Sequence, residues 1–160
     1  LYNFAYTPFI TSQIPEAKII HCIRHPLDNI LSIYRAHFAN ESRYSSSLID
    51  CAKLYILQNR VMNFYKSKFT NNIYTLDYDL LVNSPKKEIK KLIRWLGWEW
   101  KEYYLNPHLN KRNVSTASNI SVRSPINNKS IGGWRNYKKL MKPAIDELSK
   151  LSEFKYLLND

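Results

Sequence analysis

The stretch that decides the fold is PEAKIIHCIRHPLDNILSIY, residues 15–34. Its first half, from Ala17 to Ile23, is a short apolar run after a proline, which predicts a β-strand. Its second half, from Pro26 onward, repeats apolar residues at three- and four-residue spacing, which predicts a helix that begins at the proline. Arg24 falls between the two, where the chain turns from strand to helix.

The segments that follow extend this pattern into an α/β unit. A long helix is expected over residues 47–68, and residues 72–76 (NIYTL) predict a second strand, with residues 77–81 as its tail. Strands joined by helices form parallel sheets, so we predict an α/β fold with a short parallel sheet flanked by helices. The polar side chains of the long helix are expected to face water: Lys53, Gln58, Asn59 and Arg60.

The C-terminal half of the sequence predicts two more helices with a long loop between them. The first is expected between Ser84 as N-cap and Gly97 as stop. From residue 106 to residue 137 the chain is rich in Asn, Ser, Lys and Arg and is interrupted by prolines and glycines, which predicts a loop. Loops of this size in compact domains are usually functional or disordered. The last helix is expected to begin at Pro143.

The composition favours an anionic partner. The 160 residues carry a formal net charge of +11, which suits a nucleotide, nucleic acid or a membrane surface, and the charge alone does not choose among them. Two cysteines, Cys22 and Cys51, give no disulfide framework and no zinc spacing, and the four histidines are scattered. We therefore expect no metal site.

No apolar run reaches the roughly 18 to 20 residues that a membrane helix needs, so a soluble, cytoplasmic protein is expected. The sequence begins without a methionine and opens directly into an aromatic segment. We therefore expect residues 1–160 to be one domain whose N-terminal part precedes Leu1.

The position of Arg24 is one where open α/β sheets bind ligands. It lies just past the expected carboxyl end of the first strand and beside the N-terminus of the following helix, which favours an anion. Ser32, eight residues later, could donate its hydroxyl proton to the same anion. On the pattern alone, an ion pair of Arg24 with Asp28 and a bond of Ser32 to its own helix explain these residues equally well.

Residues 15–34 resemble the 3′-phosphate-binding segment of P-loop-fold sulfotransferases. The likeness is closest to bacterial sulfotransferase domains similar to tyrosylprotein sulfotransferases, which are often fused to upstream tetratricopeptide repeats. In that family an Arg after the strand and a Ser eight residues later hold the 3′-phosphate of the cofactor. Arg24 and Ser32 match those two positions.

A second stretch, LDYDLL at residues 76–81, resembles the Tyr-Glu-Asp-Leu segment of the same family. The resemblance implies that Tyr78 contacts the adenosine part of the cofactor. The alternative is an aromatic side chain that packs on the core at the edge of the sheet.

A third likeness covers the loop at residues 114–126 and 130–137, whose family counterpart closes over the cofactor. It implies a Ser near the transferring sulfuryl group, for which Ser118 is the best match and Ser115 the competitor. Further cofactor contacts are expected at Lys129, just before the second range, and at Gly132 within it. The family often has a basic residue where this chain has Gly133, so Lys129 or Arg135 is expected to replace it if the contact is kept.

The resemblance implies a transferase that moves a sulfuryl group from 3′-phosphoadenosine 5′-phosphosulfate (PAPS) to a hydroxyl or amine acceptor without a metal. No Gly-rich loop precedes Arg24, because the only glycines are Gly97, Gly132 and Gly133. We therefore expect a partial three-layer P-loop-type fold that lacks the N-terminal strand and the phosphate loop, and a chain that is inactive by itself. The competing hypothesis is a basic, non-enzymatic module that binds nucleic acid or an anionic polymer.

Overall fold

The computed structural model describes residues 3–36, 43–111 and 121–159. Its two strands are β1 (Ile19–Ile23) and β2 (Ile73–Asp77). Its α-helices are α1 (Thr7–Gln13), α2 (Pro26–Ala36), α3 (Leu48–Lys68), α4 (Tyr78–Asn83), α5 (Pro85–Leu96) and α6 (Lys138–Leu148). Short 3₁₀ turns connect them: η1 (Asn3–Tyr6), η2 (Arg43–Ser46), η3 (Glu102–Leu105), η4 (Pro107–Leu109), η5 (Ser121–Arg123), η6 (Gly133–Tyr137) and η7 (Ser152–Leu158).

The two strands pair in parallel, as the strand–helix–helix–strand order predicts. The register runs from Ile19 opposite Ile73 to Ile23 opposite Asp77. Both strands therefore end at the same edge, and the residues that follow them, Arg24 and Tyr78, emerge side by side. This edge is where an open parallel sheet presents its ligand site.

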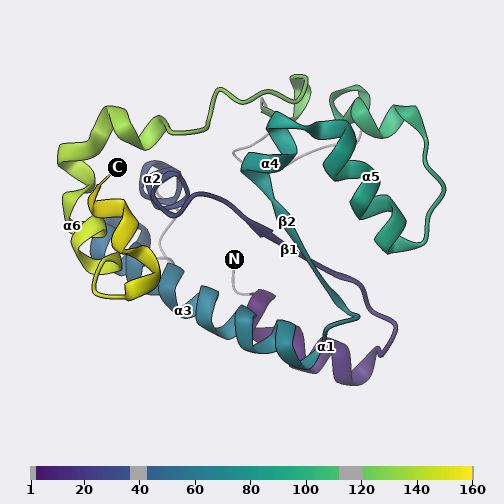
Figure 1. Ribbon diagram of the computed structural model, residues 1–160, viewed down its shortest axis with the longest axis horizontal. Coiled ribbons are helices and arrows are strands. Elements are labelled where there is room, and N and C mark those ends of the chain that lie inside the picture. Colours follow the sequence, from purple (N-terminus) through teal and green to yellow (C-terminus); the bar gives the residue numbers. More distant parts are fainter. Residues whose placement is uncertain (1–2, 37–42, 112–120, 160) are drawn as a thin grey trace.

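The helices are distributed around this small sheet (Figure 1). Helices α1 and α3 run on one side of the strands, while α4 and α5 lie on the other and pack on β2. Helix α6 and the C-terminal turn η7 pack at one end of the molecule, where α6 contacts both α2 and α3. The prediction of a short parallel sheet flanked by helices is confirmed.

The hydrophobic core lies between α2, α3 and α6 and not beneath the sheet. Its largest fully buried side chain is Trp134, from η6. The remaining members come from the three helices and the C-terminal turn: Leu27, Ile30, Leu31, Leu48, Cys51, Ala52, Met141, Ala144, Ile145, Leu148, Phe154 and Leu157. The loop segment that contains Trp134 is thereby fixed to the helices by apolar burial.

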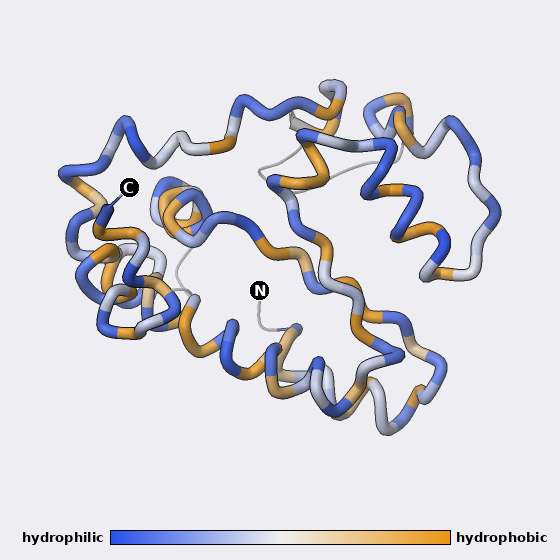
Figure 2. Tube along the Cα trace, in the orientation of Figure 1, coloured by the Kyte–Doolittle hydropathy of each residue, from blue (hydrophilic) through white to orange (hydrophobic). Residues whose placement is uncertain are grey.

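Helix α5 shows how the sequence pattern places its faces. Apolar and hydrophilic residues alternate along it from turn to turn in Figure 2, and Ile93 is buried while its lysines are exposed. Pro85 occupies the first turn, and Gly97 ends the helix with φ of 74°, a left-handed conformation that glycine adopts without steric cost. The predicted boundaries of this helix are confirmed.

Two predicted boundaries are wrong. Residues 78–81 do not continue β2, because the Asp77 side chain accepts the N–H groups of Asp79 (2.8 Å) and Leu80 (3.1 Å) and so caps a new helix, α4. The last helix begins at Lys138, five residues before Pro143, which lies inside it. Pro143 removes one helical N–H, but Met141 on its N-terminal side is fully buried, and this packing favours continuation of the helix through the proline.

One face of β1 is exposed. His21 is buried toward α3, whereas Ile20 and Cys22, which alternate with it along the strand, are exposed. Within residues 3–36, 43–111 and 121–159, no helix combines the length and apolar character needed to span a membrane.

Candidate functional site

The candidate site lies at the carboxyl edge of the sheet, where Arg24 and Tyr78 meet. The Arg24 guanidinium carbon lies 5.0 Å from the centroid of the Tyr78 ring, a cation–π contact. The backbone carbonyl of Arg24 accepts a hydrogen bond from the Tyr55 hydroxyl of α3 at 3.3 Å. The end of β1 is thus held by groups from both sides of the sheet.

The loop before η6 is bound across the N-terminus of α2. Arg24 Nη2 donates to the carbonyl oxygen of Ser130, and the buried carboxylate of Asp28 accepts the N–H groups of Gly132 (2.6 Å) and Trp134 (3.0 Å). These contacts join residues more than a hundred positions apart in the sequence. Residues 130–134, near the C-terminal end of the predicted loop, are therefore docked beside Arg24.

His25 links the loop to β2's end. Its ring stacks on Trp134, with centroids 5.6 Å apart and planes inclined by 5°. Its backbone N–H donates to Asp79 Oδ2 at 3.0 Å. The carboxylates of Asp28 and Asp79 thus accept backbone N–H groups, while the Arg24 guanidinium contacts a carbonyl and a ring.

A small polar cavity of about 20 Å³ lies between β1, α2 and α3, large enough for one water molecule. It is lined by His21, Cys22, Ile23, Arg24, Asn29, Tyr55, Gln58 and Asn59. Burial lowers the pKa of His21 to about 4, with Lys66 as a second cause, so this imidazole is neutral at pH 7. His21 Nδ1 and Arg24 Nε are buried without a partner among the described residues. The prediction that Gln58 and Asn59 face water is wrong, since both are half-buried here.

Ser32 lies in α2 one turn after Asp28, and its side chain is exposed. Residues four apart share a helix face, so Ser32 is on the face that Asp28 presents to the loop. The two structural alternatives for Arg24 and Ser32 are not found. Asp28 binds the loop and not Arg24, and Ser32 makes no hydrogen bond within the described residues.

The other predicted site residues of the loop differ in their surroundings, and two of them are not described by the structure. Lys129 has an exposed side chain, and its backbone N–H donates to Asn127 Oδ1 at 3.2 Å. Gly132 has φ of 69°, and a Cβ there would lie 2.5 Å from Arg135 Nη1. At Gly133 a Cβ would lie 3.7 Å from Asp28 Oδ1, and Arg135 lies over the Trp134 ring at 5.0 Å. Ser115 and Ser118 fall outside the described residues.

Sequence reasoning missed the parts that fix the loop, namely Asp28 as its anchor and His25 as its stacking partner. The sequence assigns Asp28 to the first turn of a helix, where an acidic residue is favoured by the helix dipole alone. Nothing in the local pattern indicates that residues 132–134 supply its hydrogen-bond donors.

We expect Asp28→Asn to loosen the loop and to lower the free energy of unfolding by about 1.5–3 kcal/mol. The amide has a single acceptor oxygen, so one of the two N–H groups that now bind a buried carboxylate would face an NH₂ group. Urea denaturation measures the loss, and hydrogen exchange at Gly132 and Trp134 should accelerate. The matched control, Asp146→Asn on the exposed surface of α6, should cost less than about 1 kcal/mol. Equal losses for the two variants would contradict the anchoring role.

The fold and this edge define an α/β protein whose candidate ligand site combines a fixed guanidinium, an aromatic ring and a docked loop. The sequence model of the sulfotransferase family matches residues 1–102, which include Arg24, Ser32 and Tyr78. The chain belongs to the sulfotransferase family.

A relative is found in Aquifex aeolicus (strain VF5), where it is described as an uncharacterized protein. It is 32% identical over 152 residues, which cover 93% of this chain and 20% of the relative. The chain thus spans about a fifth of the length of the relative that it matches.

Proposed function

We propose that this chain forms the 3′-phosphate and adenosine side of a sulfotransferase site whose sulfuryl donor is PAPS. In this proposal it is the C-terminal portion of one sulfotransferase domain, nearest to the bacterial domains that resemble tyrosylprotein sulfotransferases. The support for this closer relation is the likeness of residues 15–34, 76–81 and 130–137 to those domains.

The observation that carries the proposal is the setting of Arg24. Its guanidinium is held beside the N-terminus of α2 by the Tyr78 ring and the Ser130 carbonyl, and its Nε is buried without a partner among the described residues. A buried N–H without an acceptor is costly, and the guanidinium to which it belongs is a strong hydrogen-bond donor to phosphate. The chemistry of this edge therefore fits an anionic group.

The proposed roles follow from what each side chain can donate. Arg24 neutralises the 3′-phosphate, and the hydroxyl of Ser32 in α2 donates a hydrogen bond to it. The half-buried Tyr78 ring offers a flat apolar face to adenosine.

The loop supplies the remaining proposed contacts. Gly132 brings backbone close to the cofactor, and the exposed Lys129 supplies the charge that Gly133 does not carry. Ser118, with Ser115 as the alternative, is proposed to contact the transferring group.

When bound, the cofactor would supply the sulfuryl group that passes to a hydroxyl or amine acceptor. For such transfers a protein acts mainly by positioning and by stabilising charge on the oxygens, as in phosphoryl transfer. Arg24, Ser32 and Lys129 contribute donors of that kind.

The proposal is tested by the preference of the full-length protein for a 3′-phosphate. Adenosine 3′,5′-bisphosphate should bind at least about tenfold more tightly than adenosine 5′-monophosphate, because only the former reaches the Arg24 guanidinium. Isothermal titration calorimetry measures both affinities. Equal affinities would contradict the assignment of this edge to the 3′-phosphate.

The 160-residue chain alone is expected to show no steady sulfate transfer, since its glycines are at positions 97, 132 and 133 and none forms a phosphate-cradling loop before Arg24. The measurement is transfer of labelled sulfate from PAPS to a panel of phenols, alcohols and amines. Sustained turnover by this chain would show that the site is complete without further segments.

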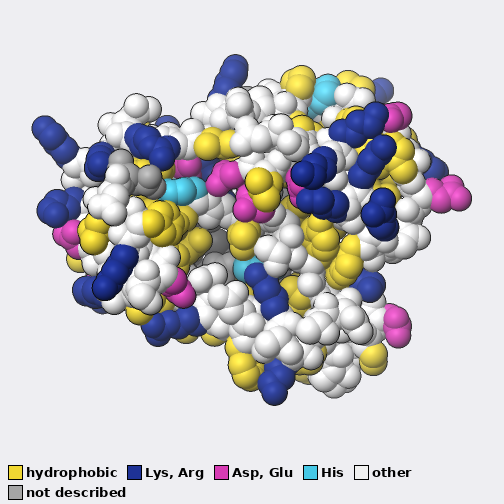
Figure 3. Space-filling view, in the orientation of Figure 1, with side chains coloured by type: hydrophobic (Ala, Val, Ile, Leu, Met, Phe, Trp, Pro, Cys, Tyr) yellow, Lys and Arg dark blue, Asp and Glu magenta, His cyan; other side chains and the backbone are white. Residues whose placement is uncertain are grey.

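The alternative of a basic module for nucleic acid predicts one continuous cationic surface. In Figure 3, Lys and Arg side chains occur over separate regions of the visible face, with hydrophobic and uncharged groups between them. Two of the α5 lysines are ion-paired, Lys86 with Glu102 (3.0 Å) and Lys91 with Glu88 (2.7 Å). No observation favours this alternative.

A further inference from the structure

A second pocket in the described part of the chain lies away from the candidate cofactor site. It has a volume of about 310 Å³ and is formed by α3 together with the end of α6 and the residues after it. Its lining residues are Lys53, Ile56, Leu57, Arg60, Glu147, Lys150 and Leu151. Small-molecule sites in proteins begin at about this volume and often lie between helices.

The pocket and the candidate cofactor site are on opposite faces of α3. Residues 53, 56, 57 and 60 follow the spacing of one helix face, whereas Tyr55, Gln58 and Asn59 line the polar cavity beneath Arg24. A ligand in this pocket would therefore not touch Arg24, and its binding is independent of the proposed sulfotransferase function.

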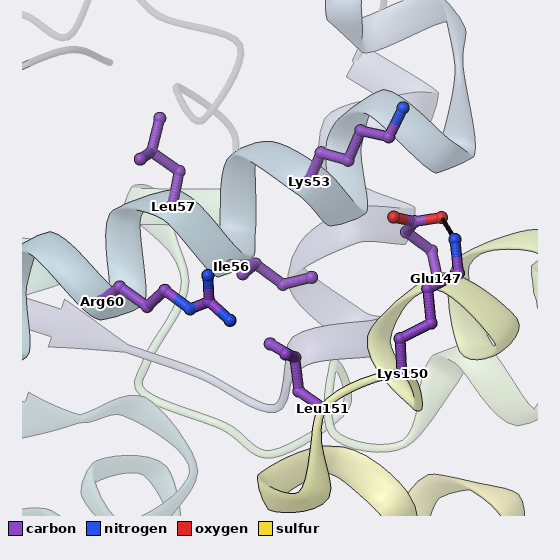
Figure 4. Close-up of a pocket in the computed structure, with 7 residues that line it drawn as sticks. All are labelled: Lys53, Ile56, Leu57, Arg60, Glu147, Lys150 and Leu151. Carbon is purple, nitrogen blue, oxygen red and sulfur yellow. Dashed lines mark hydrogen bonds and ion pairs between the residues drawn. The ribbon is translucent and has the colours of Figure 1, made fainter.

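The floor of the pocket is apolar. In Figure 4, Ile56 from α3 and Leu151 from the segment after α6 extend toward one another, with Arg60 on one side and the Glu147–Lys150 pair on the other. Leu57 is 53% exposed, although it borders the same space. Binding of an apolar group against these side chains would remove apolar surface from water, which is favourable.

The rim of the pocket has an excess of positive charge. Lys150 is paired with Glu147, so that pair is neutral overall. Lys53 and Arg60, seven residues apart on α3 and therefore about 10 Å apart along its axis, have no acidic partner in the described part of the chain. The α3 segment that lines the pocket thus has a cationic side chain at each end, Lys53 and Arg60.

We infer that this pocket binds a small amphiphilic anion, with an aliphatic or aromatic body against Ile56, Leu57 and Leu151 and an anionic head at Arg60 or Lys53. The guanidinium of Arg60 suits a carboxylate or a sulfate ester, since either accepts two hydrogen bonds from its fork. A neutral apolar molecule would leave the charges without partners, and a small inorganic anion would leave the floor uncovered.

The probe for this site is octanoate, which joins a carboxylate to a short aliphatic chain. Titration of the protein should give saturable shifts of the Ile56 and Leu151 methyl resonances in NMR spectra. Octylammonium, which has the same chain and the opposite charge, and acetate, which has no chain, should each bind at least about tenfold more weakly. Equal binding of octylammonium, or no saturable shift with octanoate, would overturn the inference.

Two variants test whether octanoate binds in this pocket. Arg60→Gln should raise the Kd of octanoate about fivefold, and Leu57→Asp about tenfold, because the latter adds a like charge to the exposed part of the floor. Leu57 and Arg60 are both exposed, so neither change threatens the core. Arg94→Gln in α5 makes the same charge change elsewhere and should leave the Kd within about twofold. An unchanged Kd in Arg60→Gln and Leu57→Asp would refute the location.

Discussion

Replacing Arg24 by Ala is expected to weaken the binding of adenosine 3′,5′-bisphosphate to the full-length protein about 10- to 100-fold, or about 1.4–2.7 kcal/mol. The guanidinium is positioned by Tyr78 and Ser130 before any ligand arrives, so little conformational entropy is lost when it engages a phosphate. Calorimetric titration of wild type and variant gives the ratio of the two Kd values.

The design of that experiment separates the 3′-phosphate from the rest of the nucleotide. Adenosine 5′-monophosphate should lose no more than about twofold in affinity in the Arg24→Ala variant, because it has no 3′-phosphate to lose contact with. Arg94→Ala, an exposed arginine of α5, is the charge-matched control. A bisphosphate affinity that is the same in wild type and Arg24→Ala would remove Arg24 from the site.

Trp134→Ala should lower the free energy of unfolding by about 3–5 kcal/mol, the largest stability effect that we expect in this chain. The Trp134 side chain is fully buried in the core and stacks on His25, so the truncation leaves a cavity and releases the loop from the site. Urea denaturation followed by circular dichroism measures the change.

Trp98→Ala is the matched control, since this side chain is 59% exposed and its removal should cost less than about 1 kcal/mol. If Trp134→Ala does not fold, Trp134→Phe keeps a ring against His25 and should cost about 1–3 kcal/mol. A loss below about 1 kcal/mol in Trp134→Ala would show that the loop is not part of the core.

Local sequence patterns predicted most of the secondary structure, because residues such as proline and glycine set where helices begin and end. Pro26 opens α2, Gly97 ends α5 in a left-handed conformation, and the strand–helix–helix–strand order gives a parallel pair. The errors occurred where another interaction outweighed the local signal. A capping carboxylate at Asp77 ended β2 early, and burial of Met141 carried α6 through Pro143.

The candidate site was only partly predictable, since its parts come together from distant segments. The position of Arg24 after β1 follows from the sequence alone, and parallel pairing then places Tyr78 beside it. That Asp28 binds residues 132–134 depends on the tertiary path of the loop, for which the sequence has no periodic signal. The paired roles proposed for Arg24 and Ser32 stay a prediction.

The most direct measurement is a crystal structure of the full-length protein with adenosine 3′,5′-bisphosphate. We expect the 3′-phosphate within hydrogen-bond distance of both the Arg24 guanidinium and the Ser32 hydroxyl, with the nucleoside against Tyr78. A nucleotide bound with its 3′-phosphate away from Arg24, or with Ser32 directed to a different group, would contradict the assignment of this sheet edge.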